Sequence, residues 1–179
     1  LLFKIFADID VFDIEIDTKN IDEFIETVKN ISPTFGGINL EDIKAPEAFE
    51  IERRLVDELD IPVMHDDQHG TAIISGAALI NALELANKKI GEIRMVICGA
   101  GAAAISCAKM YKSLGVKKKN ILMFDSKGLI NVNRKDLSLE KKLFASKNVE
   151  IESLADAING SDVFILSLIH ISEPTRPMN

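Results

Sequence analysis

Short apolar runs alternate with amphipathic stretches along most of this chain of 179 residues. Short runs flanked by polar residues or glycine are typical of buried strands, and they fall at 34–40, 61–64, 94–98, 121–124 and 162–166. Apolar residues at helical spacing occur between these runs, over 21–31, 46–59, 71–86, 102–114, 139–146 and 154–158. Strands that alternate with helices predict an α/β fold with a doubly wound parallel sheet.

The hydrophobic pattern also predicts details in the first half of the chain. Residues 1–7 and 11–17 are strand-like, and in 11–17 apolar and polar positions alternate as in a half-buried strand. For the helix over 21–31, we expect Asn20 to be the N-cap, with Glu23 at the capping-box position. The helix over 71–86 is apolar nearly all round, so we expect it to be buried between two domains.

Composition and charge narrow the class of protein. The net charge is −7 and the pI is near 5.0, so nucleic acid is not expected to be the main partner. The basic triplet at 117–119 is interpreted as part of a solvated loop. Cys98 and Cys107 are expected to be buried, reduced thiols of a cytoplasmic protein. No apolar run reaches the roughly 20 residues that a membrane span needs, so no membrane segment is expected.

Acidic residues follow two of the predicted strands. Glu41 and Asp42 come after the run 34–40, and Asp67 comes shortly after the run 61–64. The carboxyl ends of strands in an open α/β sheet are where ligands bind. Two carboxylates about 4 Å apart repel by roughly 1 to 4 kcal/mol, and a hard cation that prefers oxygen ligands reverses the sign of this energy. The pattern therefore favours a Mg²⁺ or Mn²⁺ site at Glu41, Asp42 and Asp67.

Other interpretations of these residues stay open. Glu41 and Asp42 would also suit the N-terminus of a helix, where the macrodipole favours negative charge. Asp67 and its neighbour Asp66 would also suit the start of the next helix. The two histidines of this segment, at 65 and 69, have no third nitrogen or sulfur ligand nearby, so no zinc site is expected. We expect them either to have a structural role or to contact groups that hold the metal.

A glycine-rich turn follows the strand at 94–98 and opens the helix at 102–114, which is the context of a dinucleotide-binding loop. Gly99 permits the tight turn, Gly101 lets backbone amides approach a pyrophosphate, and Ala104 allows close packing of helix and strand. Asp125, at the end of the next strand, is placed for the adenosine ribose. It would disfavour a 2′-phosphate, whereas the next two residues could hold one, so NAD and NADP both stay open. The predicted dinucleotide contacts are Thr71, Gly99, Ala100, Gly101, Ala102, Ala103, Ala104, Asp125, Ser126 and Lys127.

Several of these segments together resemble the bacterial malic enzymes. The resemblance rests on FGGINLED (35–42), PEAFEIE (46–52), HDDQHGTA (65–72), GAGAA (99–103) and DSKG (125–128), and it extends from residue 1 to about 166. It implies oxidative decarboxylation of malate to pyruvate and CO₂, with NAD or NADP as hydride acceptor. By position, Glu41, Asp42 and Asp67 match the ligands of the divalent metal, and Asp66 is expected to orient a neighbouring group.

The resemblance also implies that part of the catalytic machinery lies outside this chain. The family's general base is a lysine just before residue 1, its general acid is a tyrosine further upstream, and the asparagines that hold malate lie beyond residue 166. Lys4 and Tyr111 stand at non-matching positions, and we assign neither a catalytic role. We therefore expect this polypeptide to be inactive by itself and its parent protein to be an enzyme, a homo-oligomer at full length.

The resemblance divides the chain into three parts. Residues 1–68 are expected to be the C-terminal part of the N-terminal catalytic domain, and 69–166 a truncated Rossmann-type NAD(P)-binding domain. Residues 167–179 resemble a translated sequencing adapter and are left out of the functional interpretation. Two other functions stay open: a malolactic enzyme, which makes lactate with the same motifs, and a non-catalytic nucleotide-binding domain.

Overall fold

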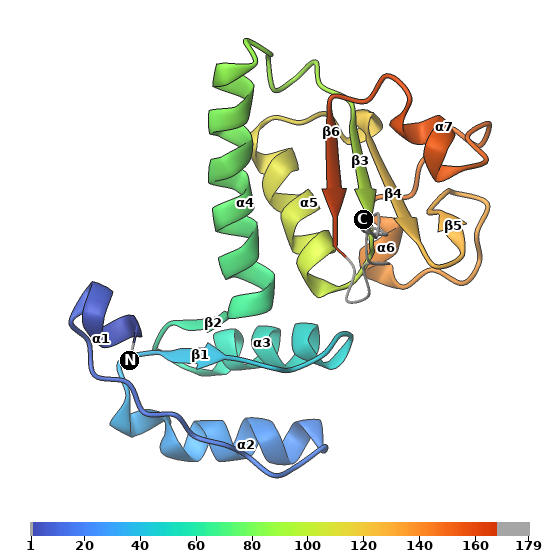
Figure 1. The fold of residues 1–179 in the computed structure, drawn as a ribbon. Helices are drawn as coiled ribbons and strands as arrows, with labels where there is room; N and C mark the ends of the chain where they lie inside the picture. Colours follow the sequence, from blue (N-terminus) through green and yellow to red (C-terminus); the bar gives the residue numbers. More distant parts are fainter. Residues whose placement is uncertain (1, 168–179) are drawn as a thin grey trace, which may run out of the picture.

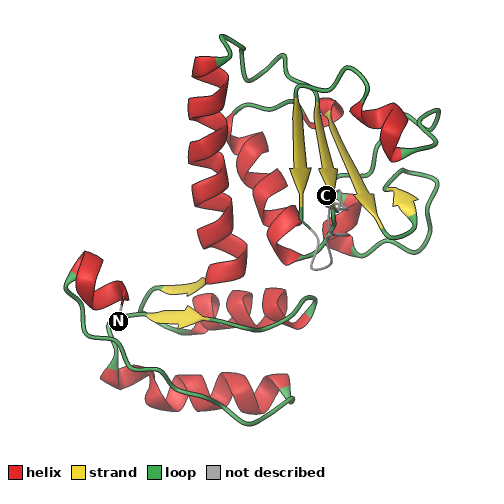
Figure 2. Ribbon diagram, viewed as in Figure 1, coloured by secondary structure: helices red, strands yellow, loops and turns green. Residues whose placement is uncertain are grey.

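The structure is a computed structural model that describes residues 2–167 (Figure 1). A small layer of helices and a two-stranded sheet lies at one end, and a larger sheet flanked by helices lies at the other (Figure 2). The long helix α4 (Asp66–Leu85) leads directly from the small sheet towards the larger one. The predicted tail at 167–179 lies almost wholly outside the described residues.

The small sheet consists of β1 (Ile38–Leu40) and β2 (Val63–His65), which pair in parallel. Helices α2 (Ile21–Ile31) and α3 (Glu47–Glu58) pack beside it, and the short 3₁₀ helix η1 (Ser32–Thr34) follows α2. The core of this part contains Ile25, Val28, Leu40, Ile51 and Leu55. As predicted, α2 begins after an Asn20 cap, whose Oδ1 accepts from the N–H groups of Asp22 and Glu23.

The larger sheet has the strand order β5–β4–β3–β6. Strands β3 (Met95–Cys98), β4 (Ile121–Asp125) and β6 (Val163–Leu166) are parallel, and the short β5 (Gly128–Leu129) is antiparallel to β4. The remaining helical elements of this part are α5 (Ala102–Leu114), η2 (Lys118–Asn120), α6 (Leu139–Lys142) and α7 (Leu154–Ile158). The predicted α/β fold with a parallel sheet is therefore confirmed.

Alternate residues of each strand face opposite sides of this sheet, and each side has its own core. Met95, Ile97 and Met123 pack with residues of α4 and α5. Val96 and Leu122 pack on the other side, in the cluster that includes Ala157 of α7. Both sides of the sheet are covered, as expected for strands that are apolar along their whole length.

Two strand predictions near the start of the chain are wrong. Residues Leu2–Ala7 form the helix α1, and the alternating segment 11–17 has an extended but unpaired backbone. Val11, Phe12 and Ile14 are about half exposed or more. An alternating pattern forms a strand only when another strand supplies hydrogen bonds, and no strand among residues 2–167 lies beside this one.

The prediction for α4 is also partly wrong. The helix begins at Asp66, five residues before the predicted start at Thr71, because His65 already ends β2. Only one of its faces is buried, at residues such as Ala72 and Leu79, whereas Ile74 is 72% exposed. The other exposed apolar side chains of the helix are Ile73, Ile80 and Leu85. Within residues 2–167, no helix combines the length and apolar character that a membrane crossing requires.

Smaller details also differ from the predictions. Glu23 does not close a capping box, because its carboxylate accepts from the Thr18 hydroxyl at 2.7 Å. The strand predicted over 34–40 pairs only from Ile38, and the helix predicted over 139–146 ends at Lys142. Cys107 is buried as expected, but Cys98 is only partly buried; both are free thiols.

Candidate active site

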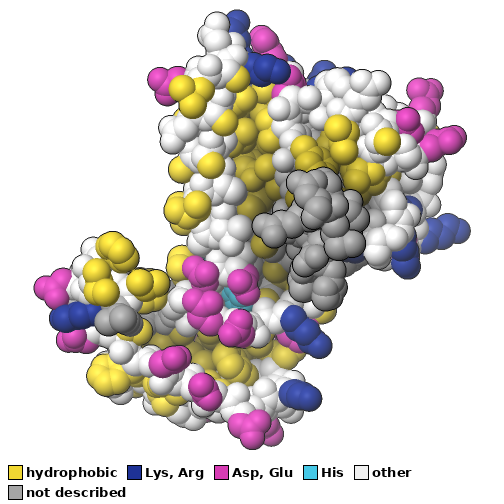
Figure 3. Space-filling model, in the orientation of Figure 1, with side chains coloured by type: hydrophobic (Ala, Val, Ile, Leu, Met, Phe, Trp, Pro, Cys, Tyr) yellow, Lys and Arg dark blue, Asp and Glu magenta, His cyan; other side chains and the backbone are white. Residues whose placement is uncertain are grey.

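The acidic motifs meet at one edge of the small sheet. Leu40 and His65 are paired residues at the ends of β1 and β2, so Glu41 and Asp66 leave neighbouring strands at adjacent positions. Adjacent strands lie about 4.8 Å apart, which brings these two segments of the chain together. Figure 3 shows Asp and Glu side chains gathered around a histidine over the region where the small sheet leads to α4. The prediction that both acidic motifs follow strand ends is therefore confirmed.

Glu41 and Asp42 are both exposed at this edge. The Glu41 carboxylate accepts from the side-chain amide of Asn39 at 2.9 Å. Asp42 has a φ of 55°, in the left-handed region that few residues other than glycine adopt. Such a backbone conformation costs about 1 to 3 kcal/mol, and it often occurs at functional sites.

Asp66 and Asp67 occupy the first turn of α4, where the helix dipole favours negative charge. The Asp66 side chain lies over Gly70, since a Cβ atom added at position 70 would come within 2.3 Å of its Oδ1. A glycine at this position therefore leaves room for the Asp66 carboxylate. Asp67, by contrast, is exposed.

The chemistry of this acidic edge fits a hard cation. Glu41, Asp42, Asp66 and Asp67 make no ion pair with any lysine or arginine of the described chain, so their charges are not neutralised there. Carboxylate oxygens are the ligands that Mg²⁺ and Mn²⁺ prefer. However, across residues 2–167 no three His, Cys, Asp or Glu side chains are arranged closely enough to hold a metal ion. The ligand set Glu41, Asp42 and Asp67 stays a prediction.

The two histidines make protein contacts. His65 is fully buried, and its Nε2 lies 3.1 Å from the carbonyl oxygen of Ile43. The His69 ring lies against Glu52 of α3, with 2.8 Å between Nε2 and Oε1. These contacts agree with the structural role expected for both residues.

The glycine turn lies between β3 and α5, as predicted. Gly99 has a φ of +122°, and a Cβ atom there would lie 2.1 Å from the carbonyl oxygen of Ser167. At Gly101 an added Cβ would meet no atom of the described chain within 4 Å. Ala104 is fully buried, which agrees with the close packing expected of it. The open space before the α5 N-terminus suits the approach of a phosphate to free backbone N–H groups.

Asp125 ends β4 and lies within a cluster of charges. Its carboxylate accepts from both terminal nitrogens of Arg134, at 2.8 and 3.0 Å, from Lys141 Nζ at 2.8 Å and from the Lys127 N–H at 3.0 Å. Burial alone would raise the pKa of this carboxyl, but the hydrogen bonds from Arg134 and Lys141 outweigh it and hold the pKa well below its ordinary value of 3.8. Asp136 extends the cluster by accepting from Arg134 and Lys127.

These contacts bear on the ribose contact predicted for Asp125. A carboxylate offers about four lone-pair sites, and the four donors around Asp125 use that capacity. A ribose hydroxyl would therefore have to replace one of these donors. The dinucleotide roles of Asp125, Ser126, Lys127 and Thr71 stay predictions.

Lys4 and Tyr111 are not placed for catalysis. Lys4 forms exposed ion pairs with Asp8 and Asp10, at 2.9 and 3.1 Å. Tyr111 is fully buried in the core beside α4. These positions agree with the decision to assign neither residue a catalytic role.

Three charged residues contact the predicted site although no role in it was predicted for them. They are Glu52, which holds His69, and Arg134 and Lys141, which hold Asp125. Their partners lie 9 to 17 residues away along the chain, and no spacing rule in a sequence marks such pairs.

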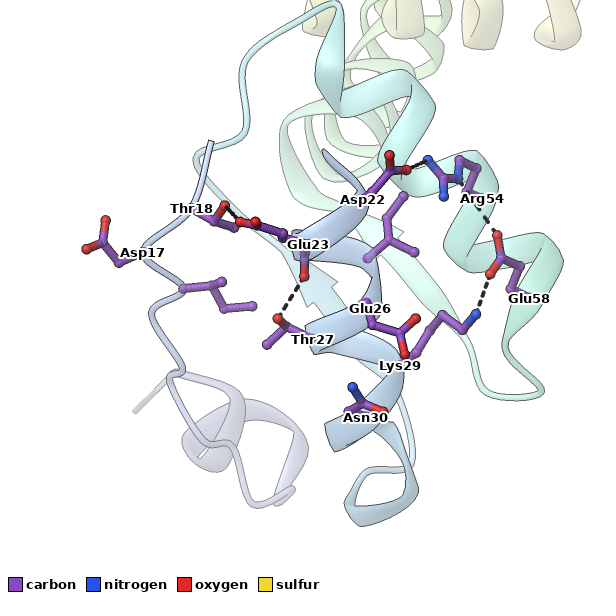
Figure 4. Close-up of a pocket in the computed structure, with 12 residues that line it drawn as sticks. Asp17, Thr18, Asp22, Glu23, Glu26, Thr27, Lys29, Asn30, Arg54 and Glu58 are labelled. Carbon is purple, nitrogen blue, oxygen red and sulfur yellow. Dashed lines mark hydrogen bonds and ion pairs between the residues drawn. The ribbon is translucent and has the colours of Figure 1, made fainter. Parts of the chain in front are cut away.

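Another cleft lies away from these residues. It has a volume of about 800 Å³ and lies between α2, α3 and the extended segment near Thr18 (Figure 4). Ion pairs from Arg54 to Asp22 and from Lys29 to Glu58, each 2.7 Å long, lie along its wall. None of the predicted catalytic, metal or dinucleotide residues lines this cleft.

The larger domain has a parallel sheet with a glycine turn before α5, and α4 joins it to the acidic edge. These features are those of a dinucleotide-binding α/β protein with an adjoining carboxylate site. Family comparison makes this more specific. The family model "Malic enzyme, NAD binding domain" matches residues 68–172, and "Malic enzyme, N-terminal domain" matches residues 18–56. The chain belongs to the malic enzyme family.

Curated relatives agree with this assignment. The chain is 52% identical over 166 residues to the NADP-dependent malic enzyme of Escherichia coli, covering 92% of this chain and 22% of that protein. It is 51% identical over 175 residues to the NAD-dependent malic enzyme of Rhizobium meliloti, covering 97% and 23%. The chain thus spans about a fifth to a quarter of the length of these two relatives.

Solved structures are also similar. The NAD-dependent malic enzyme of Thermotoga maritima is 44% identical with a TM-score of 0.84, over 92% of this chain and 45% of that one. The malic enzyme of Pyrococcus horikoshii is 41% identical with a TM-score of 0.84, over 93% and 41%. These structures confirm the Rossmann-type character of the larger sheet.

Proposed function

We propose that the parent protein of this chain oxidatively decarboxylates malate to pyruvate and CO₂ with NAD⁺ or NADP⁺, and that this chain carries its carboxylate and dinucleotide sites. The observation that supports the proposal most is the arrangement around α4. The acidic edge lies at the N-terminus of this helix, and the same helix packs against α5, which begins at the glycine turn.

Each site has a defined task in this proposal. Glu41, Asp42 and Asp67 would hold the divalent cation, and the backbone amides from Gly101 onward would hold the pyrophosphate. A bound cation supplies stabilisation of negative charge on the substrate oxygens, and a bound dinucleotide supplies the hydride acceptor. The carboxylates concentrate negative charge where the cation binds, and Gly101 keeps the approach to the helix N-terminus clear.

The division of the chain is part of the proposal. Residues 1–68 would belong to the catalytic domain and 69–166 to the dinucleotide domain, with the boundary falling inside α4. We expect no malate turnover by this chain alone, because Lys4 is held in exposed ion pairs and Tyr111 is buried away from the acidic edge. A base and an acid would have to come from elsewhere in the parent protein.

The test uses the intact gene product, with malate and either dinucleotide, in the presence of Mg²⁺ or Mn²⁺. We expect pyruvate, CO₂ and reduced dinucleotide in equal amounts, and no turnover in excess chelator. Asp67→Asn should abolish turnover with little change in dinucleotide affinity, whereas Asp60→Asn, an exposed aspartate outside the motifs, should not.

Three results would overturn the proposal in different ways. Lactate without net reduction of the dinucleotide would assign the protein as a malolactic enzyme. Dinucleotide binding that responds to neither metal nor malate would indicate a non-catalytic domain. Full activity in chelator would contradict the metal site at Glu41, Asp42 and Asp67.

A further inference from the structure

Glu52 makes one hydrogen bond and one close contact with a histidine ring, and no role was predicted for it. It lies on α3, and its side chain is only 12% exposed. One oxygen, Oε1, accepts from the backbone N–H of His65 at 2.8 Å and lies 2.8 Å from Nε2 of the His69 ring. A single carboxylate oxygen thus connects α3 to two points of another segment.

The first of these points is the junction of β2 and α4. His65 is the last residue of β2 and the N-cap of α4, and no described side chain caps the helix there. In the described sheet, β2 has a neighbouring strand on one side only. The Glu52 carboxylate supplies the acceptor that a second neighbouring strand would otherwise provide for this N–H group.

The second point lies one helical turn further on. His65 and His69 are four residues apart, and Asp66 and Asp67 lie between them. Residues at this spacing lie on the same face of a helix. Because both are held by one oxygen, the first turn of α4 is fixed in direction and in rotation about its axis, and so are the Cα–Cβ bonds of Asp66 and Asp67.

We propose that Glu52 is a positioning residue that directs Asp67, and with it the carboxylate site, through His65 and His69. This inference rests on the proposed function, since it takes Asp67 to be a metal ligand. Its role in this inference is to orient the first turn of α4, because its Oε1 contacts the His65 N–H and the His69 ring. Groups that orient metal ligands commonly change metal affinity 10- to 100-fold when they are removed.

The test compares four variants of the full 179-residue chain. One of them, Asp67→Asn, removes a predicted metal ligand and serves as the reference for lost Mn²⁺ affinity. Glu52→Gln keeps an oxygen that can accept from both donors, whereas Glu52→Leu removes it. Glu50→Leu is the matched control, because Glu50 lies on the same helix and its one ion-pair partner among residues 2–167 is Arg54. Circular dichroism establishes that each variant is folded. The measurements are amide hydrogen exchange over residues 66–70 and Mn²⁺ binding, followed by the electron paramagnetic resonance signal of free Mn²⁺.

We expect Glu52→Leu to accelerate exchange over 66–70 at least tenfold and to weaken Mn²⁺ binding about 10- to 100-fold. Glu52→Gln and Glu50→Leu should remain within about twofold of the parent chain in both measurements.

If Glu52→Leu binds Mn²⁺ as tightly as the parent chain, or if Glu50→Leu loses as much affinity as Glu52→Leu, Glu52 has no positioning role. If the parent chain itself binds no Mn²⁺, the metal assignment of the proposed function is wrong, and the exchange data alone then report on Glu52. Should Glu52→Leu fail to fold, a loss of Mn²⁺ affinity in Glu52→Gln equal to that of Asp67→Asn would overturn the inference.

Discussion

The two glycines of the dinucleotide loop should respond differently to replacement by alanine. Gly99→Ala should reduce stability, whereas Gly101→Ala should reduce dinucleotide affinity. At Gly99 the backbone φ is +122°, and an added Cβ would lie 2.1 Å from the backbone oxygen of Ser167. A backbone conformation of this kind costs a residue with a side chain about 1 to 3 kcal/mol. The contact adds roughly 1 to 3 kcal/mol, because a main-chain atom must move. Gly99→Ala should therefore lower the free energy of unfolding by about 2 to 6 kcal/mol.

Gly101 has neither constraint. Its φ is −83°, which any residue can adopt, and an added Cβ meets no described atom within 4 Å. Gly101→Ala should change the free energy of unfolding by less than about 1 kcal/mol, towards greater stability, because alanine restricts the unfolded chain. The methyl group would nevertheless occupy the space before the α5 N-terminus, so dinucleotide affinity should fall at least tenfold.

Urea denaturation followed by circular dichroism measures stability, and the fluorescence of reduced dinucleotide measures binding. A Gly99→Ala variant as stable as the parent chain would refute the strain argument. A Gly101→Ala variant that binds dinucleotide normally would show that the pyrophosphate does not lie over this glycine. A large loss of stability in Gly101→Ala would mean that the space is filled.

The charge cluster and the α2 cap give two further predictions. The folded-state pKa of Asp125 lies below its ordinary value of 3.8, so the stability that it contributes is present above about pH 4 and is lost as the pH falls below that value. Arg134→Met should remove part of this contribution and lower the free energy of unfolding by about 1 to 3 kcal/mol at pH 7 and by less in acid. Urea titrations between acid and neutral pH would measure this difference. An equal loss at every pH would contradict the link between stability and the ionisation of Asp125. Asn20→Ala removes the acceptor for two N–H groups of α2 and should cost about 0.5 to 2 kcal/mol, measured by the same titration, whereas no loss would mean that water replaces the cap.

Local patterns predicted much of the larger sheet and its loop. The helix over 102–114 and the strand ending at Cys98 match the structure closely, and the glycine turn predicted between them is present, with a positive φ at Gly99. These features depend on residues that are close together in the chain, such as apolar spacing, caps and turn glycines. For that reason they can be predicted from the sequence.

Predictions that required a distant partner were less successful. The alternation over 11–17 is a strand pattern, but no neighbouring strand is present among residues 2–167, and its apolar side chains stay exposed. Likewise, α4 is apolar on nearly all sides, yet its sequence does not say which side meets α5. Only packing leaves Ile74 exposed and Leu79 buried.

The sequence by itself determined the α/β class, the glycine loop, the acidic motifs and the family to which they belong. Only the tertiary structure decided which side chains contact the predicted site residues. Arg134 and Lys141 donate to Asp125, and Glu52 accepts from the backbone N–H at the start of α4. A hydrogen bond between residues on different elements depends on how those elements pack. Packing follows from the burial of the whole core, and no short pattern of residues encodes it.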